Sequence, residues 1–562
     1  MRPLLTGFLV LLSYSLFAQI GNPYSYKVQK KIVASKGAVV AAHPLASRVG
    51  LAILEKGGNA FDAAIATQLA LAVVYPGAGN IGGGGFMVAH TAAGRNIALD
   101  FREKAPAAAT KDMYLDANGN ARTDLSQNGH LASGVPGTIA GIFAELRYAR
   151  LPISTLIQPA IDLAEKGFSI TDAEARSLNA SQNSFKKYNT VMPVFIREGG
   201  WKAGDTLVQK DLAKTLRRIS DKGAAGFYEG ETARLIQEEM QRGKGIITEA
   251  DLRGYQAKER EATVFPYKKY SIVTMPLPSS GGVILQQMMK MVEGQPLRSY
   301  GFLSPRAVHI MTEAERLAYA DRAKYLGDKD YYSVPVKTLT SAPYIRQRVS
   351  LIQPDKAGTS EDIQAGVLSP ASEETTHLEV YDRDGNAVAI TTTLNGGYGC
   401  KVVVAGAGFL LNNEMDDFSI KPGVPNMYGA VGAEANAIAP GKRMLSSMTP
   451  TLVLDKGKVY IITGTPGGTT ITTSVFQTLI DMLDFNMTPE DAVNKPKFHH
   501  QWLPDEIFVE ASFPIEVREA LQKMGYRITQ RGHIGRTEVI KVAGGKIEAV
   551  GDSRGDDTAA GY

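Results

Sequence analysis

Residues 375–395 read TTHLEVYDRDGNAVAITTTLN, two short runs rich in β-forming residues on either side of an Asp-Gly pair. Asp-Gly between such runs is a strong signal for the turn of a β-hairpin. If Tyr381 lies opposite Ala387, counting back along the strands places Thr375 opposite Thr393. A slip by one residue would break that last pair. On composition alone, these threonines are simply residues that favour strands.

The segment before the hairpin distinguishes Thr375 from the other threonines of the hairpin. Residues 355–374 are polar and show little periodicity, which predicts an exposed linker that ends immediately before Thr375. A threonine hydroxyl is a poor nucleophile without a base, and its own α-amine is available only if the residue begins a chain. Such an amine has a pKa of about 8, so a useful fraction can act as base near neutrality. A linker ending at a threonine therefore fits a chain cut between Glu374 and Thr375.

The rest of the chain divides into a helix-rich first part and a β-rich last part. Residues 43–76 carry apolar residues at helical spacing on both sides of Gly57-Gly58-Asn59, which predicts two helices joined by a glycine turn. Further helices are expected at 153–166, 211–222, 229–242, 282–292, 306–325, 472–483 and 514–524. Strands are expected at 402–411, 450–454, 458–463, 507–509, 527–529, 539–542 and 546–549.

Composition sets broad limits on the function. The 562 residues carry 44% hydrophobic and 21% charged residues, which is ordinary for a globular protein and argues against disorder or multiple membrane spans. The net charge is +4, and no run of Lys and Arg stands out that could bind the phosphates of a nucleic acid. Nucleic acid is therefore not an expected partner. Cys400 is the only cysteine. It can form no internal disulfide and is expected to be a small packed side chain.

The first eighteen residues predict a secretory signal peptide. Arg2 precedes an apolar stretch from Leu4 to Ala18. An uncleaved membrane anchor is the alternative, although the stretch is short for one, and no later segment offers about twenty uninterrupted apolar residues. We therefore expect an exported protein, in the periplasm or the medium, with no stable membrane span after signal removal.

The order of several motifs identifies the chain as a suspected member of a known family. From Thr375 onward, the chain resembles the start of the small subunit of γ-glutamyltranspeptidases, which belong to the N-terminal-nucleophile hydrolases. The blocks that carry the resemblance are 375–377 (TTH), 384–389 (DGNAVA), 393–395 (TLN), 411–418 (LNNEMDDF), 421–426 (KPGVPN), 445–450 (LSSMTP), 464–468 (GTPGG) and 498–504 (FHHQWLP). Earlier in the chain, the matching blocks are 57–60 (GGNA), 82–86 (GGGGF), 100–103 (DFRE) and 278–282 (PSSGG).

This resemblance implies a fold, a maturation and an activity. The fold would be α+β, a four-layer αββα sandwich. Self-cleavage would divide the chain into a signal peptide (1–18), a large subunit (19–374) and a small subunit (375–562), the two subunits remaining together as a heterodimer. The mature enzyme would take a γ-glutamyl group from glutathione or another γ-glutamyl amide and pass it to water, an amino acid or a peptide, without a metal or cofactor.

The resemblance also implies roles for individual residues. Thr375 would be the nucleophile, with Thr393 bonded to its hydroxyl. The backbone N–H groups of Gly467 and Gly468 would stabilise the oxyanion. Side chains that would bind the substrate share polar or charged character: Arg102, Ser446 and Ser447 for the α-carboxylate, and Asn395, Glu414 and Asp417 for the α-ammonium. Residues 421–432 with Tyr428 resemble a lid loop of one branch of the family.

Rival interpretations stay open from the sequence. The nearest is a β-lactam acylase of the cephalosporin type, which shares the fold and the nucleophile. Metal-dependent hydrolysis would need ligand spacing that the eight histidines do not supply. A serine hydrolase would need a GxSxG elbow, and the one match, residues 551–555, leaves no room for the helix and histidine that must follow. An inactive exported binding protein is the non-enzymatic alternative.

Overall fold

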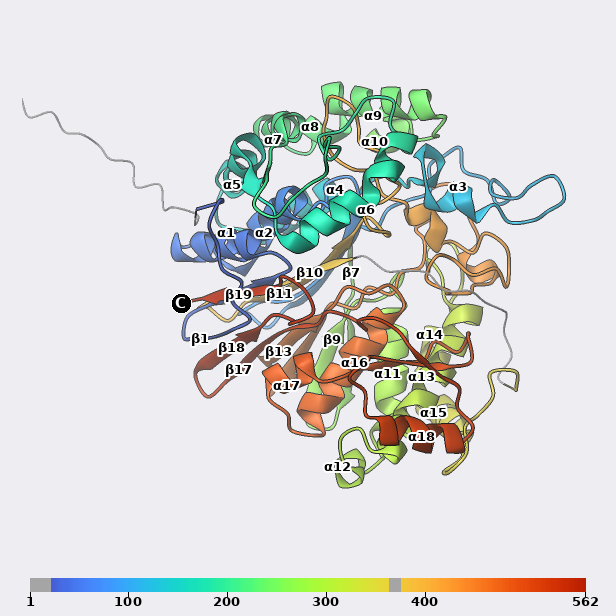
Figure 1. The fold of residues 1–562 in the computed structure, drawn as a ribbon. Helices are drawn as coiled ribbons and strands as arrows, with labels where there is room; N and C mark the ends of the chain where they lie inside the picture. The colour runs from blue at the N-terminus through green and yellow to red at the C-terminus, as the bar shows by residue number, and fades with distance from the viewer. Residues whose placement is uncertain (1–21, 363–374) are drawn as a thin grey trace, which may run out of the picture.

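Two seven-stranded sheets lie face to face in the computed structural model, and helices cover both outer faces (Figure 1). The structure describes residues 22–362 and 375–562, so the predicted signal peptide and Glu374 lie outside the described residues. Within them the order of layers is helix, sheet, sheet, helix. The predicted α+β four-layer αββα sandwich is confirmed.

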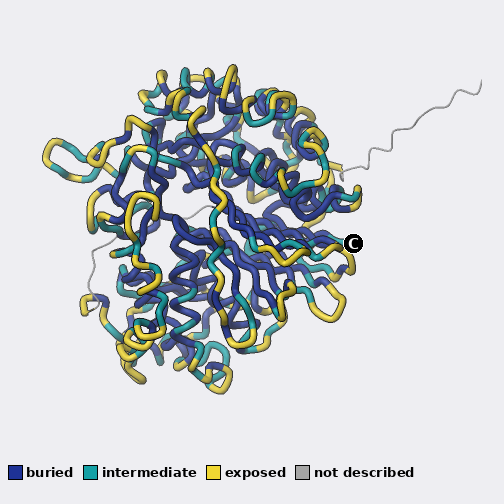
Figure 2. The backbone as a smooth tube through the Cα atoms, turned by 180° about the vertical axis from the view of Figure 1, so that it is seen from behind, coloured by how far each residue is buried: buried dark blue, intermediate teal, exposed yellow. Residues whose placement is uncertain are grey.

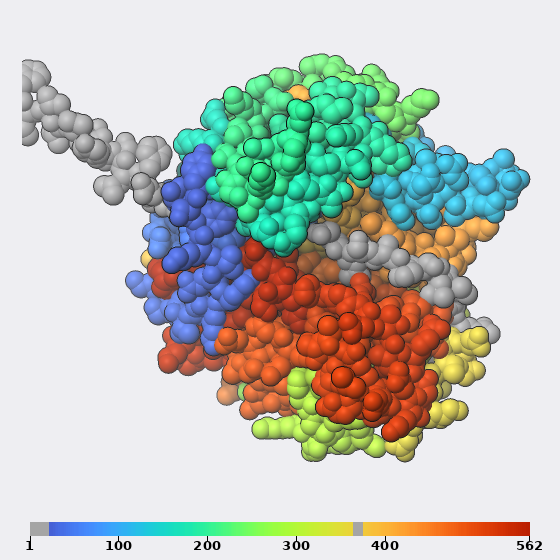
Figure 3. Space-filling model, viewed as in Figure 1, coloured from blue at the N-terminus to red at the C-terminus, as the bar shows by residue number. Residues whose placement is uncertain are grey.

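Each sheet combines strands from the N-terminal and the C-terminal parts of the chain. The first sheet runs β19 (Thr558–Gly561), β2 (Ala38–Ala41), β10 (Thr376–Tyr381), β11 (Ala387–Thr393), β3 (Gly84–His90), β4 (Asn96–Asp100) and β7 (Lys258–Arg260). The second runs β1 (Lys31–Ala34), β18 (Lys546–Val550), β17 (Glu538–Ala543), β13 (Lys458–Gly464), β12 (Thr451–Asp455), β9 (Tyr270–Thr274) and β8 (Thr263–Tyr267). N-terminal and C-terminal segments consequently lie against each other at the surface (Figure 3).

The first helical layer comes from the N-terminal part of the chain, whereas the second combines helices from the middle and the C-terminal part (Figure 1). Over the first sheet lie α1 (Pro44–Glu55), α2 (Ala60–Val74), α4 (Thr138–Glu145), α5 (Ile153–Lys166), α6 (Asp172–Tyr188), α7 (Lys210–Lys222), α8 (Ala225–Tyr228), α9 (Gly230–Gly243) and α10 (Glu249–Arg253). Over the second lie α11 (Gly281–Val292), α12 (Leu297–Tyr300), α13 (Pro305–Tyr325), α14 (Val336–Leu339), α15 (Ala342–Val349), α16 (Thr470–Leu483), α17 (Pro489–Asn494) and α18 (Ile515–Lys523). Smaller elements are α3 (Thr123–Gln127), β5 (Phe168–Ser169), β6 (Thr206–Leu207), β14 (Phe498–His499), β15 (Ile507–Val509), β16 (Ile528–Gln530) and the 3₁₀ turns at His130–Ala132, Leu146–Tyr148, Glu414–Asp417 and Glu434–Asn436.

Three apolar cores separate the four layers, and the central hairpin contributes to two of them. On β11, Val388 and Ile390 pack toward the helices of the first layer, whereas Ala387 and Ala389 pack toward the second sheet. This alternation follows from the two-residue period of a strand. Figure 2 shows the result, a buried centre of strands inside an exposed outer surface. Apolar packing therefore holds both faces of the hairpin β10–β11.

The hairpin has the predicted register. Tyr381 pairs with Ala387, and Thr376 pairs with Thr392. Thr375 and Thr393 are therefore the next facing positions along the ladder. The predicted helical pair is also confirmed. The Asn59 side chain accepts from backbone N–H groups at the start of α2, and the Asn59 N–H donates to the Asp62 carboxylate. The other predicted helices appear within two residues of their expected ends.

Two expectations about local structure are wrong. Residues 402–411 form no strand, only an isolated bridge between Val403 and Leu410, because Gly406 and Gly408 adopt positive φ and turn the chain between them. The linker is not exposed throughout its described part, since Ala357 and Ser360 are buried. The Ala357 N–H donates to the Met524 carbonyl at 2.8 Å, which ties the start of the linker to the C-terminal part of the chain.

No membrane-spanning helix occurs among the described helices. None of them combines the length and apolar character that crossing a bilayer would require.

Candidate active site

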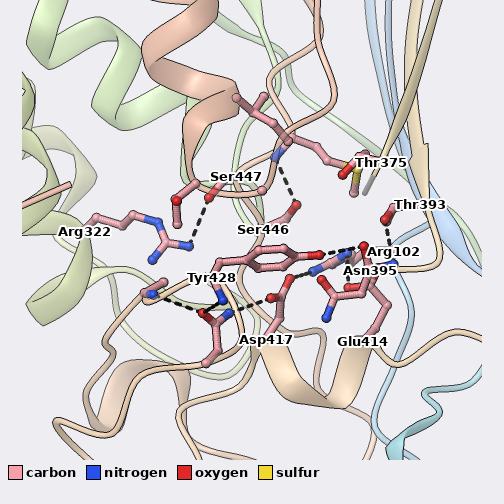
Figure 4. A pocket seen from close by; sticks show the side chains of 16 residues that line it. Arg102, Arg322, Thr375, Thr393, Asn395, Glu414, Asp417, Tyr428, Ser446 and Ser447 are labelled. Carbon is pink, nitrogen blue, oxygen red and sulfur yellow. Dashed lines mark hydrogen bonds and ion pairs between the residues drawn. The ribbon is translucent and has the colours of Figure 1, made fainter. Parts of the chain in front are cut away.

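Thr375 stands at the entry to β10, where only 4% of its surface is exposed. It lines a cavity together with Thr393 of the first sheet, residues of helices α13 and α16, the 3₁₀ turn Glu414–Asp417 and the loops around it (Figure 4). The residues lining this cavity are Arg102, Arg322, Thr375, Thr393, Asn395, Glu414, Asp417, Asn426, Tyr428, Ala430, Ser446, Ser447, Met448, Gly468, Thr469 and Ile471. We call it the Thr375 cavity.

Arg102 is the cationic centre of the Thr375 cavity. It lies two residues after the end of β4 and is almost fully buried. Its Nη1 lies 2.6 Å from Oε2 of Glu414, its Nη2 pairs with Asp417, and Oε2 of Glu103 lies 3.6 Å from Nη1. The guanidinium fork suits two oxygens at once, which here belong to two carboxylates.

Charge in this cluster is unevenly matched. Burial by itself lowers the pKa of Arg102, but Glu414, Asp417 and Glu103 outweigh it and raise that pKa above its ordinary value. Burial raises the pKa of Glu414 well above its usual range although Arg102 opposes the shift, and burial raises the pKa of Glu103 to about 8. Three carboxyl groups surround the Arg102 guanidinium, and the raised pKa values of Glu103 and Glu414 favour their neutral forms, whereas an approaching cation would favour their charged forms. A ligand bearing both an ammonium and a carboxylate would satisfy both halves of the cluster.

Asn395 and Thr393 form the wall next to Thr375. The Asn395 N–H donates to Oγ1 of Thr393 at 2.7 Å, and Nδ2 of Asn395 donates to the Asn413 carbonyl at 3.0 Å. Asn395 has a φ of 75°, the left-handed conformation that asparagine tolerates better than most residues. These contacts fix Thr393 opposite Thr375. A bond between the two hydroxyls stays a prediction.

The two serines approach the cavity from the loop before β12. Oγ of Ser446 accepts from the Met448 N–H at 3.1 Å, and Oγ of Ser447 accepts from Nη2 of Arg322 at 3.2 Å. Nε of Arg322 also donates to Oγ of Ser280 at 3.1 Å. Because Arg322 occupies an acceptor position of the Ser447 hydroxyl, it leaves the hydroxyl proton available to a ligand.

Gly467 and Gly468 precede α16 at the opposite wall. Their φ angles are 136° and 50°, which favour glycine, and a side chain at position 468 would meet the Tyr428 ring at 2.7 Å. The N-terminus of the buried helix α16 follows at Thr470. Backbone N–H groups at such a helix start carry partial positive charge and suit a developing oxyanion.

The segment 421–432 covers part of the cavity. Oη of Tyr428 donates to the Asn395 carbonyl at 2.6 Å, and Nδ2 of Asn426 donates to Oδ1 of Asp417 at 2.9 Å. Nε2 of Gln501 donates to the Tyr428 carbonyl at 3.2 Å. The segment therefore binds both walls of the Thr375 cavity.

Nearly all the residues selected from the sequence come together here. The exceptions are Glu374, which lies outside the described residues, and Gly467, which lines an adjoining cavity with Thr375. The most informative residue missed is Arg322. It sits near the end of the long helix α13, where a charged residue normally indicates a solvent-facing surface, and no nearby motif distinguishes it. Asn426 and Met448 lie within motifs that had been recognised, but were given no role.

Comparisons with known proteins agree with this geometry. A family model described as Gamma-glutamyltranspeptidase matches residues 46–562. The "Glutathione hydrolase proenzyme" of Escherichia coli strain K12 is 44% identical over 550 residues, covering 96% of this chain and 95% of the relative. A solved cephalosporin acylase from Bacillus halodurans superposes with a TM-score of 0.84 at 27% identity, covering 96% of this chain and 98% of that one. A solved γ-glutamyltranspeptidase chain from Helicobacter pylori is 47% identical with a TM-score of 0.57, covering 60% of this chain and 96% of that one.

Proposed function

Because the chain belongs to the gamma-glutamyltranspeptidase family, we propose that Thr375 first cleaves its own chain at Glu374 and then carries γ-glutamyl groups. The protein is a γ-glutamyltransferase and glutathione hydrolase. The observation that carries the proposal for its site is that Thr375 and the Arg102 cluster line one cavity. A nucleophile lies there beside paired cationic and anionic groups that match an amino-acid head group.

Each step follows from the chemistry of Thr375. Its hydroxyl attacks the carbonyl of Glu374, the peptide C–N bond breaks as the ester forms, and the released amine takes the hydroxyl proton. Water then hydrolyses the ester, so that the chain now starts at Thr375 with a free amine. That amine removes the hydroxyl proton when Thr375 attacks a γ-glutamyl amide, and the N–H groups of Gly467 and Gly468 stabilise the oxyanion. The leaving amine receives the proton, and water or another amine then takes the acyl group.

The substrate head group would replace contacts that Arg102 already makes. Its α-carboxylate binds the guanidinium of Arg102 and the hydroxyls of Ser446 and Ser447. Its α-ammonium binds Glu414 and Asp417, next to Asn395. This exchange keeps every charge paired. It also favours a γ-glutamyl group over an acyl group that lacks an ammonium and a carboxylate, because only a zwitterionic head can replace both sets of contacts.

The two products of cleavage are proposed to stay together as subunits 19–374 and 375–562. Each sheet contains strands from both segments, and five ladders join them: β19 with β2, β2 with β10, β11 with β3, β1 with β18, and β12 with β9. Separating the subunits would expose all these strand edges at once. Residues 1–18 are proposed to direct export before the subunits mature.

A denaturing gel tests this function directly. Purified protein should give two bands, and N-terminal sequencing of the smaller should begin at Thr375. The same sample should hydrolyse a γ-glutamyl-anilide. Full activity in a single uncleaved chain would contradict the mechanism.

Tyr428→Phe should weaken substrate binding while leaving cleavage intact. The change removes the hydroxyl that donates to the Asn395 carbonyl but keeps the ring over Gly468. One neutral hydrogen bond contributes about 1 kcal/mol, so we expect KM for a γ-glutamyl-anilide to rise about fivefold with little change in kcat. Steady-state kinetics measure this effect. An unchanged KM would show that the segment does not hold the substrate closed in.

Arg322→Lys should raise KM more than it lowers kcat. Lysine keeps the positive charge but cannot hold both Ser280 and Ser447 with one planar group. A misoriented Ser447 hydroxyl would cost about tenfold in KM, equivalent to about 1.4 kcal/mol. Arg298→Lys, on the short helix α12 away from the site, provides the matched control. A loss confined to kcat would argue against positioning through Ser447.

A further inference from the structure

Gln501 joins the segment 421–432 to the wall of the Thr375 cavity that carries the start of α16. It lies in the loop after β14, and only 6% of its surface is exposed. Its Nε2 donates to the Tyr428 carbonyl at 3.2 Å and to the Leu503 carbonyl at 3.1 Å. Both donor positions of the amide are therefore used, and one of them holds the covering segment.

The oxygen of the same amide contacts the start of α16. Oε1 of Gln501 accepts from Oγ1 of Thr469 at 2.6 Å and from Nε2 of His499 at 2.8 Å. Oη of Tyr319 donates to the Thr469 carbonyl, so this residue is held through its backbone as well as its side chain. Thr469 directly follows Gly468, and both line the Thr375 cavity. Gln501 consequently helps to fix the residue next to the proposed oxyanion donors.

Only one orientation of the Gln501 amide satisfies these partners. The partners of Nε2 are two carbonyl oxygens, which accept and cannot donate, so the NH₂ group must face them. The oxygen then faces Thr469 and His499, which places the ring proton of His499 on Nε2. Burial lowers the pKa of His499 to about 3, so the ring is neutral and carries a single proton. The amide is thus held in one direction, with its donors toward the segment and its acceptor toward α16.

We propose that Gln501 is a positioning residue that makes the covering segment 421–432 and the loop of Gly467 and Gly468 one unit. The inference rests on the proposed function and deepens it. When the segment is in place, the Tyr428 carbonyl holds the amide and the amide holds Thr469. Closure over a substrate is then linked to the alignment of the backbone N–H groups that stabilise the oxyanion, for which small displacements are costly.

Gln501→Glu tests the side of the amide that faces the segment. Glutamate has the same shape and keeps one oxygen for Thr469, but its second oxygen faces the carbonyls of Tyr428 and Leu503 and repels them when it is charged. We expect KM for a γ-glutamyl-anilide to rise about tenfold at pH 8.5, with little change in kcat. Hydrogen exchange followed by mass spectrometry should show faster exchange in the peptides that cover 421–432.

The effect of Gln501→Glu on KM should depend on pH. Burial beside two carbonyl oxygens raises the pKa of the introduced carboxyl above its ordinary value. Below that pKa the carboxyl is neutral and can donate to one of the carbonyls, and above it the carboxylate repels both. The ratio of KM in the variant to KM in the wild type should therefore fall from about tenfold at pH 8.5 to about twofold at pH 6.

The charged and titratable groups around residue 501 are present in both proteins, so their titration cancels in this ratio. They are His499, His500, Glu315, Asp505 and Arg531. Burial lowers the pKa of His499 to about 3 and that of His500 to about 4, so neither histidine gains a proton in this pH range. A KM ratio that changes with pH consequently reports the introduced carboxyl.

Thr469→Val tests the side of the amide that faces α16. Valine has nearly the same shape but cannot donate to Oε1 of Gln501. The bond from Gln501 to the Tyr428 carbonyl is kept, so KM and the exchange in 421–432 should stay near their wild-type values while kcat falls about fivefold. This second variant keeps the proposal testable if Gln501→Glu does not fold.

The control and the contrary outcomes are distinct. Gln530→Glu adds the same charge at an exposed position of β16 and should change neither KM nor kcat. Three results would each overturn the proposal: unchanged KM and exchange in a Gln501→Glu protein that gives two bands, a KM ratio independent of pH, or an unchanged kcat in Thr469→Val. Failure of the wild type to turn over any γ-glutamyl donor would instead overturn the proposed function.

Discussion

Thr375→Ala should leave a single full-length chain with no γ-glutamyl turnover. Alanine has no hydroxyl to attack Glu374, so the peptide stays intact and the α-amine that would serve as base is never released. Removing a nucleophile of this kind lowers kcat by at least about 1,000-fold, so the anilide assay should reach background. The buried side chain loses few atoms and the sheet ladder around it is unchanged, so the protein should still fold.

Thr376→Val is the matched control for this prediction. Thr376 is the neighbouring strand residue, it is fully buried, and its hydroxyl has no hydrogen-bond partner among the described residues. Valine has nearly the same shape, so this variant should give two bands and normal turnover. A Thr375→Ala protein that still split, or a Thr376→Val protein that did not, would assign the nucleophile to another residue.

Thr375→Ser tests the hydroxyl separately from the methyl group of threonine. The hydroxyl has two roles, self-cleavage and attack on the substrate. Serine offers the same nucleophile and the same amine after cleavage, but it lacks the methyl group that fixes the rotamer of a threonine. Two bands and reduced turnover would follow from this difference. Activity in the serine variant alone would confirm that a hydroxyl at this position is required.

Most of the candidate site residues predicted from the sequence line one cavity, and these residues belong to short motifs. The Asp-Gly turn sets the hairpin register, and that register alone brings Thr393 opposite Thr375. The motif at 464–468 keeps glycine at 467 and 468, where both residues have positive φ and a side chain at 468 would also meet the Tyr428 ring. Arg102 and Glu414 are recognised by their motifs, but their direct contact is visible only once β4 and the turn Glu414–Asp417 are folded together.

The features that could not be predicted from the sequence depend on contacts between elements far apart in the chain. Arg322 belongs to a helix whose neighbours bury it, and nothing in its local pattern separates it from a surface arginine. Residues 402–411 looked like a strand because their apolar pattern is local, whereas the turn comes from positive φ at Gly406 and Gly408. Cys400 did follow its pattern, since burial packs it inside and raises the pKa of its thiol to about 12.

Arg102→Lys should abolish most substrate turnover while leaving self-cleavage intact. Alanine at this position would leave the buried Glu103 and Glu414 and the partly buried Asp417 without the Arg102 guanidinium, at a cost of about 3–5 kcal/mol, so lysine is the cleaner test. Lysine keeps one charge but loses the fork that would hold the α-carboxylate. We expect kcat/KM for the anilide to fall about 100-fold, equivalent to about 2.7 kcal/mol, with two bands still present on the gel.

A donor without the α-carboxylate shows whether that group is the one Arg102 holds. For 4-aminobutanoyl-p-nitroanilide, the wild type should lose about 100-fold relative to the γ-glutamyl donor, and Arg102→Lys should lose little more. Non-additivity of this kind requires that the residue and the carboxylate interact. Arg95→Lys, in the exposed turn between β3 and β4, controls for a lysine introduced nearby. If the losses in Arg102→Lys and in the shortened donor simply added, Arg102 would be maintaining the shape of the cluster with Glu414 and Asp417, and the carboxylate would have to bind elsewhere.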